Sequence, residues 1–197
     1  MLKIIRTITY FFIGKLNNLL SFDSIYKTNQ KKFKSIGDNC GFKEKCFILG
    51  EQFISIGNNF HAGTHLRLEA ISKRNSQTYS PAIYIGDNVS IEDFCHIGCI
   101  EKIHIGSGTM IASRVYISDH NHGSISATDL NDIPAQRPLF SKPVDIGNNV
   151  WLGEGCCIMS GVSLGNNVIV GANAVVTHSF PDNCVIAGVP AKIIKKL

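Results

Sequence analysis

Aliphatic side chains recur at every sixth position over most of this chain, usually followed by a small or polar residue. The recurring positions are Ile85, Ile91 and Ile97, then Ile105, Ile111 and Ile117, and finally Ile146, Leu152, Ile158, Leu164, Val170 and Val176. An α-helix repeats about every 3.6 residues and a half-buried strand about every two, so neither sustains this period. A coil with three short flat sides does, because each six-residue unit forms one side and points its aliphatic side chain inward. The pattern predicts a β-helix solenoid.

A second column of small or apolar residues supports this fold. These residues lie four positions after an aliphatic one: Cys40, Phe60, Val89, Cys95, Thr109, Val115, Val150, Cys156, Val162, Val168 and Ala174. In a solenoid each inward side chain contacts its counterparts in adjacent coils, so the stack buries a core that no single repeat could bury. We expect one all-β domain over 36–190, between a basic, amphipathic segment over 1–35 and a basic C-terminal tail over 191–197.

The repeat is interrupted at three places. Ile97 and Ile105 are eight residues apart, which predicts a two-residue bulge between them. A long excursion over 118–143 leaves the coil before the repeat resumes at Ile146, and another irregular segment covers 61–82. Long loops on a rigid scaffold commonly carry functional groups, so we expect the site on the 118–143 loop.

Four segments of the C-terminal part resemble a known family. They are Asp145-Ile-Gly-Asn-Asn-Val-Trp-Leu-Gly, Ile158-Met-Ser-Gly-Val-Ser-Leu-Gly, Val170-Gly-Ala-Asn-Ala-Val-Val-Thr and Ala187-Gly-Val-Pro-Ala-Lys-Ile-Ile-Lys. As a set they resemble the hexapeptide-repeat acyltransferases, most closely the sugar O-acetyltransferase branch, over residues 36–197. The resemblance implies a left-handed parallel β-helix, acetyl-CoA as the acyl donor, and a homotrimer with active sites between subunits.

The composition fits a folded protein of a reducing compartment. Hydrophobic residues make up 44% of the chain and charged residues 17%, as in ordinary globular domains. Seven cysteines form no CxxC pair, and several lie in the inward columns, so we expect no disulfide framework and a cytoplasmic location. Cys95 and His96 would point to opposite faces of one strand, which argues against a metal site.

Positive charge is concentrated in residues 1–35, which hold seven lysines or arginines and one aspartate. The apolar stretch Ile8–Ile13 is far shorter than the ~20 residues that span a bilayer. We expect a helix over Leu2–Leu20 that packs on the solenoid or on a neighbouring subunit, and a peripheral membrane contact is the alternative. The main domain offers no basic groove, so nucleic-acid binding is not expected.

The expected catalytic groups lie where the chain leaves the coil. Acetyl transfer to a hydroxyl needs a base, and imidazole has a pKa near the operating pH. In the resembling family the catalytic histidine follows the last coil before a long loop, and an ungapped match from Val115 places it at His122. His120 would point to the same side of an extended strand, so the match does not separate the two histidines. Asp119 either orients one of them or caps the turn that begins the loop.

The C-terminal coils are expected to bind the donor. Small residues would let a pantetheine arm approach the backbone, and these are Gly153, Gly155, Gly171 and Ala172. Trp151 would form an apolar surface beside the thioester or cover a subunit interface. Lys192, Lys195 and Lys196 would meet the phosphates of coenzyme A, although the last two equally suit a solvated tail.

These features predict an acetyl-CoA-dependent O-acetyltransferase that acts on a carbohydrate hydroxyl by direct transfer, without a metal. Buried Cys156 is a poor nucleophile. The resemblance implies bacterial surface polysaccharide as the setting, with capsule, O-antigen and sialic acid all open. Alternatives are N-acetylation of an amino sugar and acetylation of serine or of a xenobiotic alcohol. A scaffold protein or a γ-carbonic-anhydrase-like metal enzyme would belong to another class, and His96, His120 and His122 do not follow that metal-binding pattern.

Overall fold

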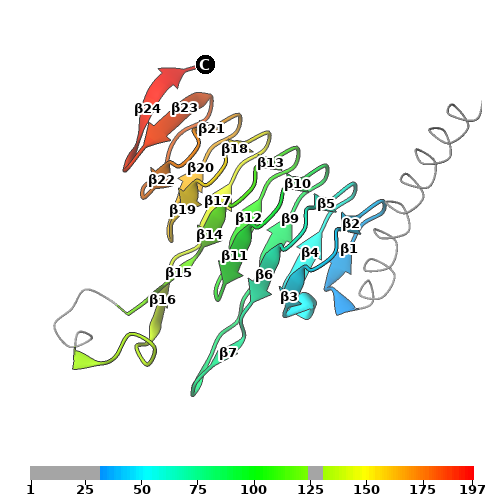
Figure 1. Ribbon diagram of the computed structural model, residues 1–197, viewed down its shortest axis with the longest axis vertical. Coiled ribbons are helices and arrows are strands. Elements are labelled where there is room, and N and C mark those ends of the chain that lie inside the picture. Colours follow the sequence, from blue (N-terminus) through cyan, green and yellow to red (C-terminus); the bar gives the residue numbers. More distant parts are fainter. Residues whose placement is uncertain (1–31, 124–130) are drawn as a thin grey trace, which may run out of the picture.

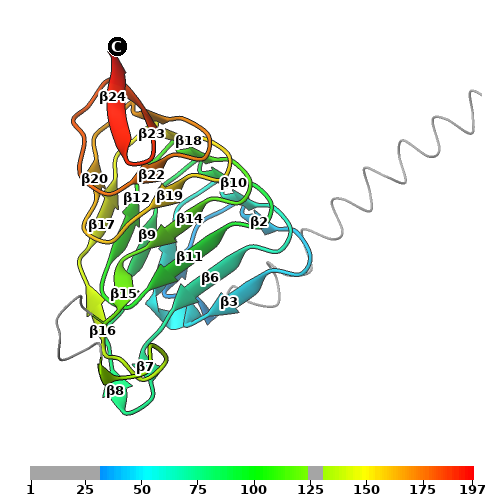
Figure 2. The same cartoon turned by 60° about the vertical axis from the view of Figure 1, so that its left-hand side comes forward.

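A computed structural model of the protein describes residues 32–123 and 131–197. Short strands joined by tight turns pass in succession to three sheets, which form the sides of a prism (Figures 1 and 2). The helix expected over Leu2–Leu20, with its packing or membrane role, lies outside the described residues. Within the described ranges, no helix is long and apolar enough to span a bilayer.

The first sheet has six strands, all paired in parallel. In spatial order they are β1 (Ser35–Ile36), β4 (Ile54–Ile56), β9 (Ile83–Ile85), β12 (Ile103–Ile105), β17 (Val144–Ile146) and β20 (Ser163–Leu164). A short 3₁₀ helix over Glu51–Phe53 precedes β4.

The second sheet has eight strands. They are β2 (Gly41–Phe42), β5 (His61–Ala62), β10 (Ser90–Ile91), β13 (Met110–Ile111), β18 (Trp151–Leu152), β21 (Ile169–Val170), β23 (Cys184–Gly188) and β24 (Ala191–Lys196). Residues 191–197, expected to form a basic tail, thus contain a strand, which pairs antiparallel with β23. This strand covers a sheet edge that would otherwise present unpaired backbone groups.

The third sheet has six strands, again paired in parallel. They are β22 (Val175–Val176), β19 (Cys157–Ile158), β14 (Tyr116–Ser118), β11 (His96–Cys99), β6 (Arg67–Ala70) and β3 (Phe47–Leu49). Two antiparallel pairs project from the prism: β7 (Lys73–Arg74) with β8 (Gln77–Thr78), and β15 (His120–His122) with β16 (Leu139–Ser141).

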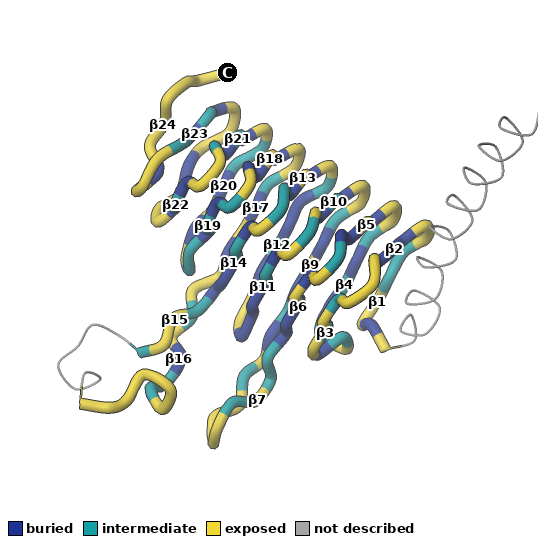
Figure 3. Tube along the Cα trace, viewed as in Figure 1, coloured by how far each residue is buried: buried dark blue, intermediate teal, exposed yellow. Residues whose placement is uncertain are grey.

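The inward columns are buried as the six-residue period predicts (Figure 3). Every aliphatic residue from Ile85 to Val176 in the first column is at most 4% exposed. Like side chains stack across coils, since Ile91 pairs with Ile111, which continues to Leu152 and Val170. Each large aliphatic side chain buried this way stabilises the fold by about 1.5–3 kcal/mol. The prediction of an all-β, parallel solenoid is confirmed.

Asparagines hold successive coils together at one corner. Asn39, Asn59 and Asn88 adopt left-handed backbone conformations, with φ of 54°, 57° and 56°, which asparagine tolerates better than most residues. The Asn39 Nδ2 donates to Asn59 Oδ1 at 2.9 Å, and the Asn59 Nδ2 donates to Asn88 Oδ1 at 3.0 Å. The ladder fixes where each coil turns relative to the next.

The buried columns can be tested with a charge. Ile158→Asp places an unpaired carboxylate in an interior that several coils share, so we expect the variant to lose its cooperative unfolding transition or to be insoluble. Glu154→Gln, four residues away on the surface, removes only an exposed pair with Arg114 and should shift the free energy of unfolding by about 1 kcal/mol or less. Circular dichroism during urea unfolding measures both, and an unchanged transition for Ile158→Asp would contradict the register.

Candidate functional site

The histidine strand leaves the prism at the end of β14, a central strand of the third sheet (Figures 1 and 2). β15 follows β14 directly and pairs antiparallel with β16, with His120 opposite Ser141 and His122 opposite Leu139. Because side chains alternate along a strand, the two histidines point to the same side of β15. Both line one pocket, as the extended-strand expectation required.

Asp119 anchors the chain where it passes from the coil into the loop. Its side chain is fully buried, and its carboxylate accepts the backbone N–H groups of Ile100, Glu101 and Lys102 at 3.0, 2.8 and 2.9 Å. Its Oδ1 also lies 2.9 Å from Nδ1 of His120. The turn that it caps is therefore the bulge of the preceding coil, which the spacing predicted, and not the first turn of its own loop.

The charge of Asp119 is well compensated. Burial alone would raise the pKa of this carboxyl, but the hydrogen bonds from His120 and from the backbone of Glu101 and Ile100 outweigh burial and hold its pKa below the usual value. An ionised carboxylate keeps the proton of the neighbouring imidazole on Nδ1, which leaves Nε2 of His120 as the free nitrogen.

The two histidines differ in access and in partners. The side chain of His120 is 11% exposed, and its Nδ1 also lies 3.3 Å from the Ser118 hydroxyl. His122 is exposed at the far end of β15. The structure thus gives the orienting carboxylate to His120 and the open position to His122.

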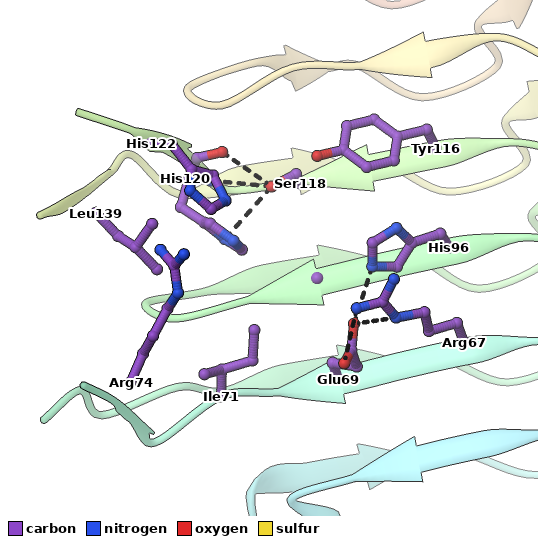
Figure 4. A pocket seen from close by; sticks show the side chains of 11 residues that line it. Arg67, Glu69, Ile71, Arg74, His96, Tyr116, Ser118, His120, His122 and Leu139 are labelled. Atoms are coloured by element: carbon purple, nitrogen blue, oxygen red, sulfur yellow. Dashed lines mark hydrogen bonds and ion pairs between the residues drawn. The ribbon is translucent and has the colours of Figure 1, made fainter. Parts of the chain in front are cut away.

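The pocket lies on the outer face of the third sheet and extends to the projecting strands (Figure 4). Its cavity volume is about 360 Å³, within the range of small-molecule sites. The outward side chains of Arg67, His96 and Tyr116 lie side by side on three successive coils, because His96 pairs with both of the others. Gly98 lies at the pocket floor, where an added Cβ would be 3.4 Å from Cε1 of His120.

An ion-paired cluster occupies the side of the pocket away from the loop. Glu69 is 6% exposed and accepts from Arg67 Nε at 2.6 Å, while Nε2 of His96 lies 3.0 Å from the same carboxylate. Burial lowers the pKa of His96 below its usual value, and the charge of Arg67 lowers it further, against the opposing effect of Glu69. Sequence reasoning did not assign Arg67, Glu69 or Tyr116 to the site.

The irregular 61–82 segment reaches the same pocket through the β7–β8 hairpin. Arg74 Nη2 donates to the carbonyl oxygen of Ala135 at 3.2 Å, and Asn75 Nδ2 lies 3.5 Å from the same oxygen. Two segments that interrupt the repeat, 61–82 and 118–143, therefore meet beside the histidines through a contact between residues 61 apart in sequence.

The expected donor-binding residues do not line this pocket. Trp151 is 47% exposed on the second sheet, next to Met110 in register, and Lys192 and Lys195 lie on β24 at the C-terminal end of the stack (Figure 1). Coil stacking already explains the small residues: an added Cβ at Gly153 would approach the carbonyl oxygen of Val170 to 2.6 Å, and one at Gly171 would approach the Ala187 Cβ to 2.9 Å. Gly155 has a positive φ of 69°, and Ala172 is exposed beside Gly171.

The cysteine thiols are poor candidates for chemistry at this site. All seven cysteines are free, and burial raises the pKa of Cys156 to about 12, so its thiolate is scarce. Cys95 is buried while His96 faces the pocket, which confirms that they lie on opposite faces. Among the described residues, no group of three or more histidine, cysteine or acidic side chains is placed to hold a metal ion.

Known proteins share this sequence pattern and fold. The family described as bacterial transferase hexapeptide (six repeats) matches residues 143–178. A protein of Escherichia coli (strain K12) with the name "Putative lipopolysaccharide biosynthesis O-acetyl transferase WbbJ" is 47% identical over 155 residues, which cover 77% of this chain and 76% of that protein.

Two solved structures extend the comparison. A variant of AntD, an N-acyltransferase from Bacillus cereus in complex with dTDP-4-amino-4,6-dideoxyglucose and coenzyme A, superimposes with a TM-score of 0.73 at 26% identity, covering 89% of this chain and 90% of AntD. A galactoside acetyltransferase in complex with coenzyme A gives a TM-score of 0.56 at 26% identity. This chain covers 66% of the galactoside enzyme, with 85% of its own length matched.

Asp119 provides a test of how the loop is anchored. A carboxyl whose pKa is lower in the folded state stabilises the fold above its unfolded pKa, and this contribution is lost as the pH falls through the folded value. Asp119→Asn should therefore lower the free energy of unfolding at pH 7 by about 2–3 kcal/mol, and the difference from the unmodified protein should shrink below about pH 4.

Urea unfolding over a pH series measures this effect. Asp145→Asn is the matched control, because Asp145 is half exposed and bonds only His104 among the described side chains. Equal stability of the Asp119 variant and the unmodified protein at every pH would show that the carboxylate does not anchor the loop.

Proposed function

The chain belongs to the hexapeptide-repeat acyltransferases, enzymes that use an acyl-CoA donor, and on this premise we propose that it transfers an acetyl group from acetyl-CoA to a carbohydrate hydroxyl. The observation that carries the proposal is the pair of imidazoles on one face of β15, at a pocket of sugar-compatible volume beside a buried carboxylate. The E. coli relative named as an O-acetyl transferase supports O-acetylation.

We assign the base to His122. The hydroxyl and the thioester must both reach the base from solvent, and His122 is the exposed member of the pair. Its imidazole would take the hydroxyl proton as the oxygen attacks the acetyl carbon, and would return that proton to the departing sulfur, so the charge balances within one complex. His120, held by Asp119, would position β15 and polarise the pocket next to the base.

We further propose that a neighbouring subunit supplies the donor groove of each site in a homotrimer. Within one chain, the histidine pocket lies on the third sheet, whereas Trp151 lies on the second and Lys192 and Lys195 lie on β24. Trp151 and Met110 also form adjacent exposed apolar positions, 47% and 44% exposed, and exposed apolar clusters of this kind favour a subunit contact. Gly153, Gly155, Gly171 and Ala172 would then face the pantetheine arm by their backbone.

The setting that we propose is synthesis of bacterial surface polysaccharide in the cytoplasm. The name of the E. coli relative refers to lipopolysaccharide biosynthesis, and the free cysteines suit a reducing compartment. N-acylation of an amino sugar is the second candidate, because AntD, with the same fold, is an N-acyltransferase that binds an amino sugar nucleotide. Matched sugar and amino-sugar acceptors, assayed by release of free coenzyme A and mass of the product, separate the two.

The base assignment is tested by three single variants. His122→Ala should lower kcat by about 10²–10⁴, the usual contribution of a positioned general base, with little change in acetyl-CoA binding. His120→Ala should cost less, and His104→Ala, on the first sheet, should leave turnover unchanged. If turnover disappears only in the His120 variant, the base is His120 oriented by Asp119, and if both loop variants remain active, the pocket is not the catalytic centre.

Mixing variants tests whether the site is shared. His122→Ala and Trp151→Ala subunits, each nearly inactive alone, should regain part of the activity when they are unfolded together and refolded, because some interfaces then contain both intact groups. Sedimentation velocity on the unmodified protein gives the assembly state. An active monomer would refute the shared site, since one chain would then supply both histidine and donor groove.

A further inference from the structure

Among the described residues, the acidic groups at the pocket have partners, whereas one cationic group is only partly hydrogen-bonded. Glu69 is the acidic side chain among the lining residues, and both of its oxygens are already engaged by Arg67 and His96. The carboxylate of Asp119, just behind the pocket, is hydrogen-bonded to three backbone amides and to His120. Arg74, the cationic side chain that enters from the opposite side, has no carboxylate partner among the described residues.

Arg74 presents a buried, unsatisfied donor to this space. Its Nη2 is bonded to the Ala135 carbonyl oxygen, but its Nη1 is buried and has no hydrogen-bond partner in the part of the chain that the structure describes. In Figure 4 the guanidinium points from the hairpin toward Leu139 and His120. A buried donor that remains unpaired costs free energy, and more when it carries charge, so a ligand oxygen at this position would remove a penalty that the protein otherwise bears.

The β7–β8 hairpin and a bond to the 118–143 loop hold the guanidinium of Arg74 in place. Arg74 lies on β7, whose partner strand β8 closes a tight hairpin, and the bond to Ala135 ties the hairpin to the 118–143 loop. A guanidinium fixed through one nitrogen offers its other nitrogen in a defined direction, which suits the planar oxygens of carboxylate and phosphate.

We propose that the acceptor is an acidic carbohydrate, whose carboxylate or phosphate group is bound by Nη1 of Arg74 while its hydroxyl faces the histidines of β15. This inference rests on the proposed function and narrows its substrate class. Arg67 does not compete for the anion, because Glu69 holds its guanidinium.

Three acceptors of one ring stereochemistry test the proposal: galactose, galacturonate and galactose 1-phosphate. The unmodified protein should show a kcat/KM at least about tenfold higher for one of the acidic sugars than for galactose, as expected for a charge-assisted hydrogen bond. Arg74→Gln should abolish this preference, mainly by raising KM for the acidic sugars, with a smaller loss of kcat/KM for galactose. Arg74→Lys should retain part of it.

Two controls isolate the guanidinium. Lys73→Gln removes one positive charge from the exposed side of the same strand, and it should keep the preference. Asn75→Gly removes the neighbouring contact with Ala135 at a position whose φ of 53° glycine tolerates. It should also keep the preference, which separates anion binding from support of the loop. A preference for galacturonate identifies a carboxylate, and one for galactose 1-phosphate identifies a phosphate.

The result that overturns the proposal is a galactose kcat/KM equal to or above that of both acidic sugars, or an equal loss for all three acceptors in Arg74→Gln. Calorimetric binding of the same three sugars distinguishes this failure from failure of the proposed function. If none is acetylated, the O-acetyltransferase assignment to these sugars fails, yet tighter binding of an acidic sugar that disappears in Arg74→Gln still supports the anion site. If neither acidic sugar binds more tightly than galactose, the site is refuted.

Discussion

Parallel stacking in strict register is the constraint on which this structure depends. Each coil pairs with the next along all three sheets, so a side chain at one phase of the repeat meets the same phase in the coils beside it. Inward, this rule builds the aliphatic columns, and at an exposed corner it builds the asparagine ladder. Outward, it aligns Arg67, His96 and Tyr116 as a single row. The floor of the pocket is thus a by-product of the rule that builds the core.

The functional side chains lie where the chain departs from the regular six-residue repeat. The bulge after Ile97 turns three backbone amides toward one point, and the next coil places the Asp119 carboxylate there. Such concave sets of N–H groups favour an anion. The carboxylate in turn fixes His120 at the start of β15. A departure from the repeat in one coil therefore supports the exit of the chain from the next, and two irregularities combine into one anchored site.

The sequence was sufficient to predict those parts of the fold that depend on the six-residue period. The aliphatic columns, the bulge between Ile97 and Ile105 and the exit after Ile117 all follow from counting positions. The cluster of Arg67, Glu69 and Arg74 did not, because its alignment with His96 depends on how the irregular 61–82 segment rejoins the stack, and no period describes that segment. The glycines expected to approach the donor, such as Gly153, are already required by close coil packing, so their pattern alone does not report on a ligand.

The base of the 118–143 loop is closed by short bonds between its two ends. The backbone N–H of Lys142 donates to the carbonyl oxygen of Asp119 at 2.9 Å, and the Ser160 hydroxyl donates to the same oxygen at 2.8 Å. With both ends clamped, the cost of lengthening the chain between β15 and β16 is mainly the entropy of loop closure, which rises slowly with length. The chain that joins β15 to β16 can therefore change in length without displacing His120 and His122, which the clamped strand β15 holds beside the stack.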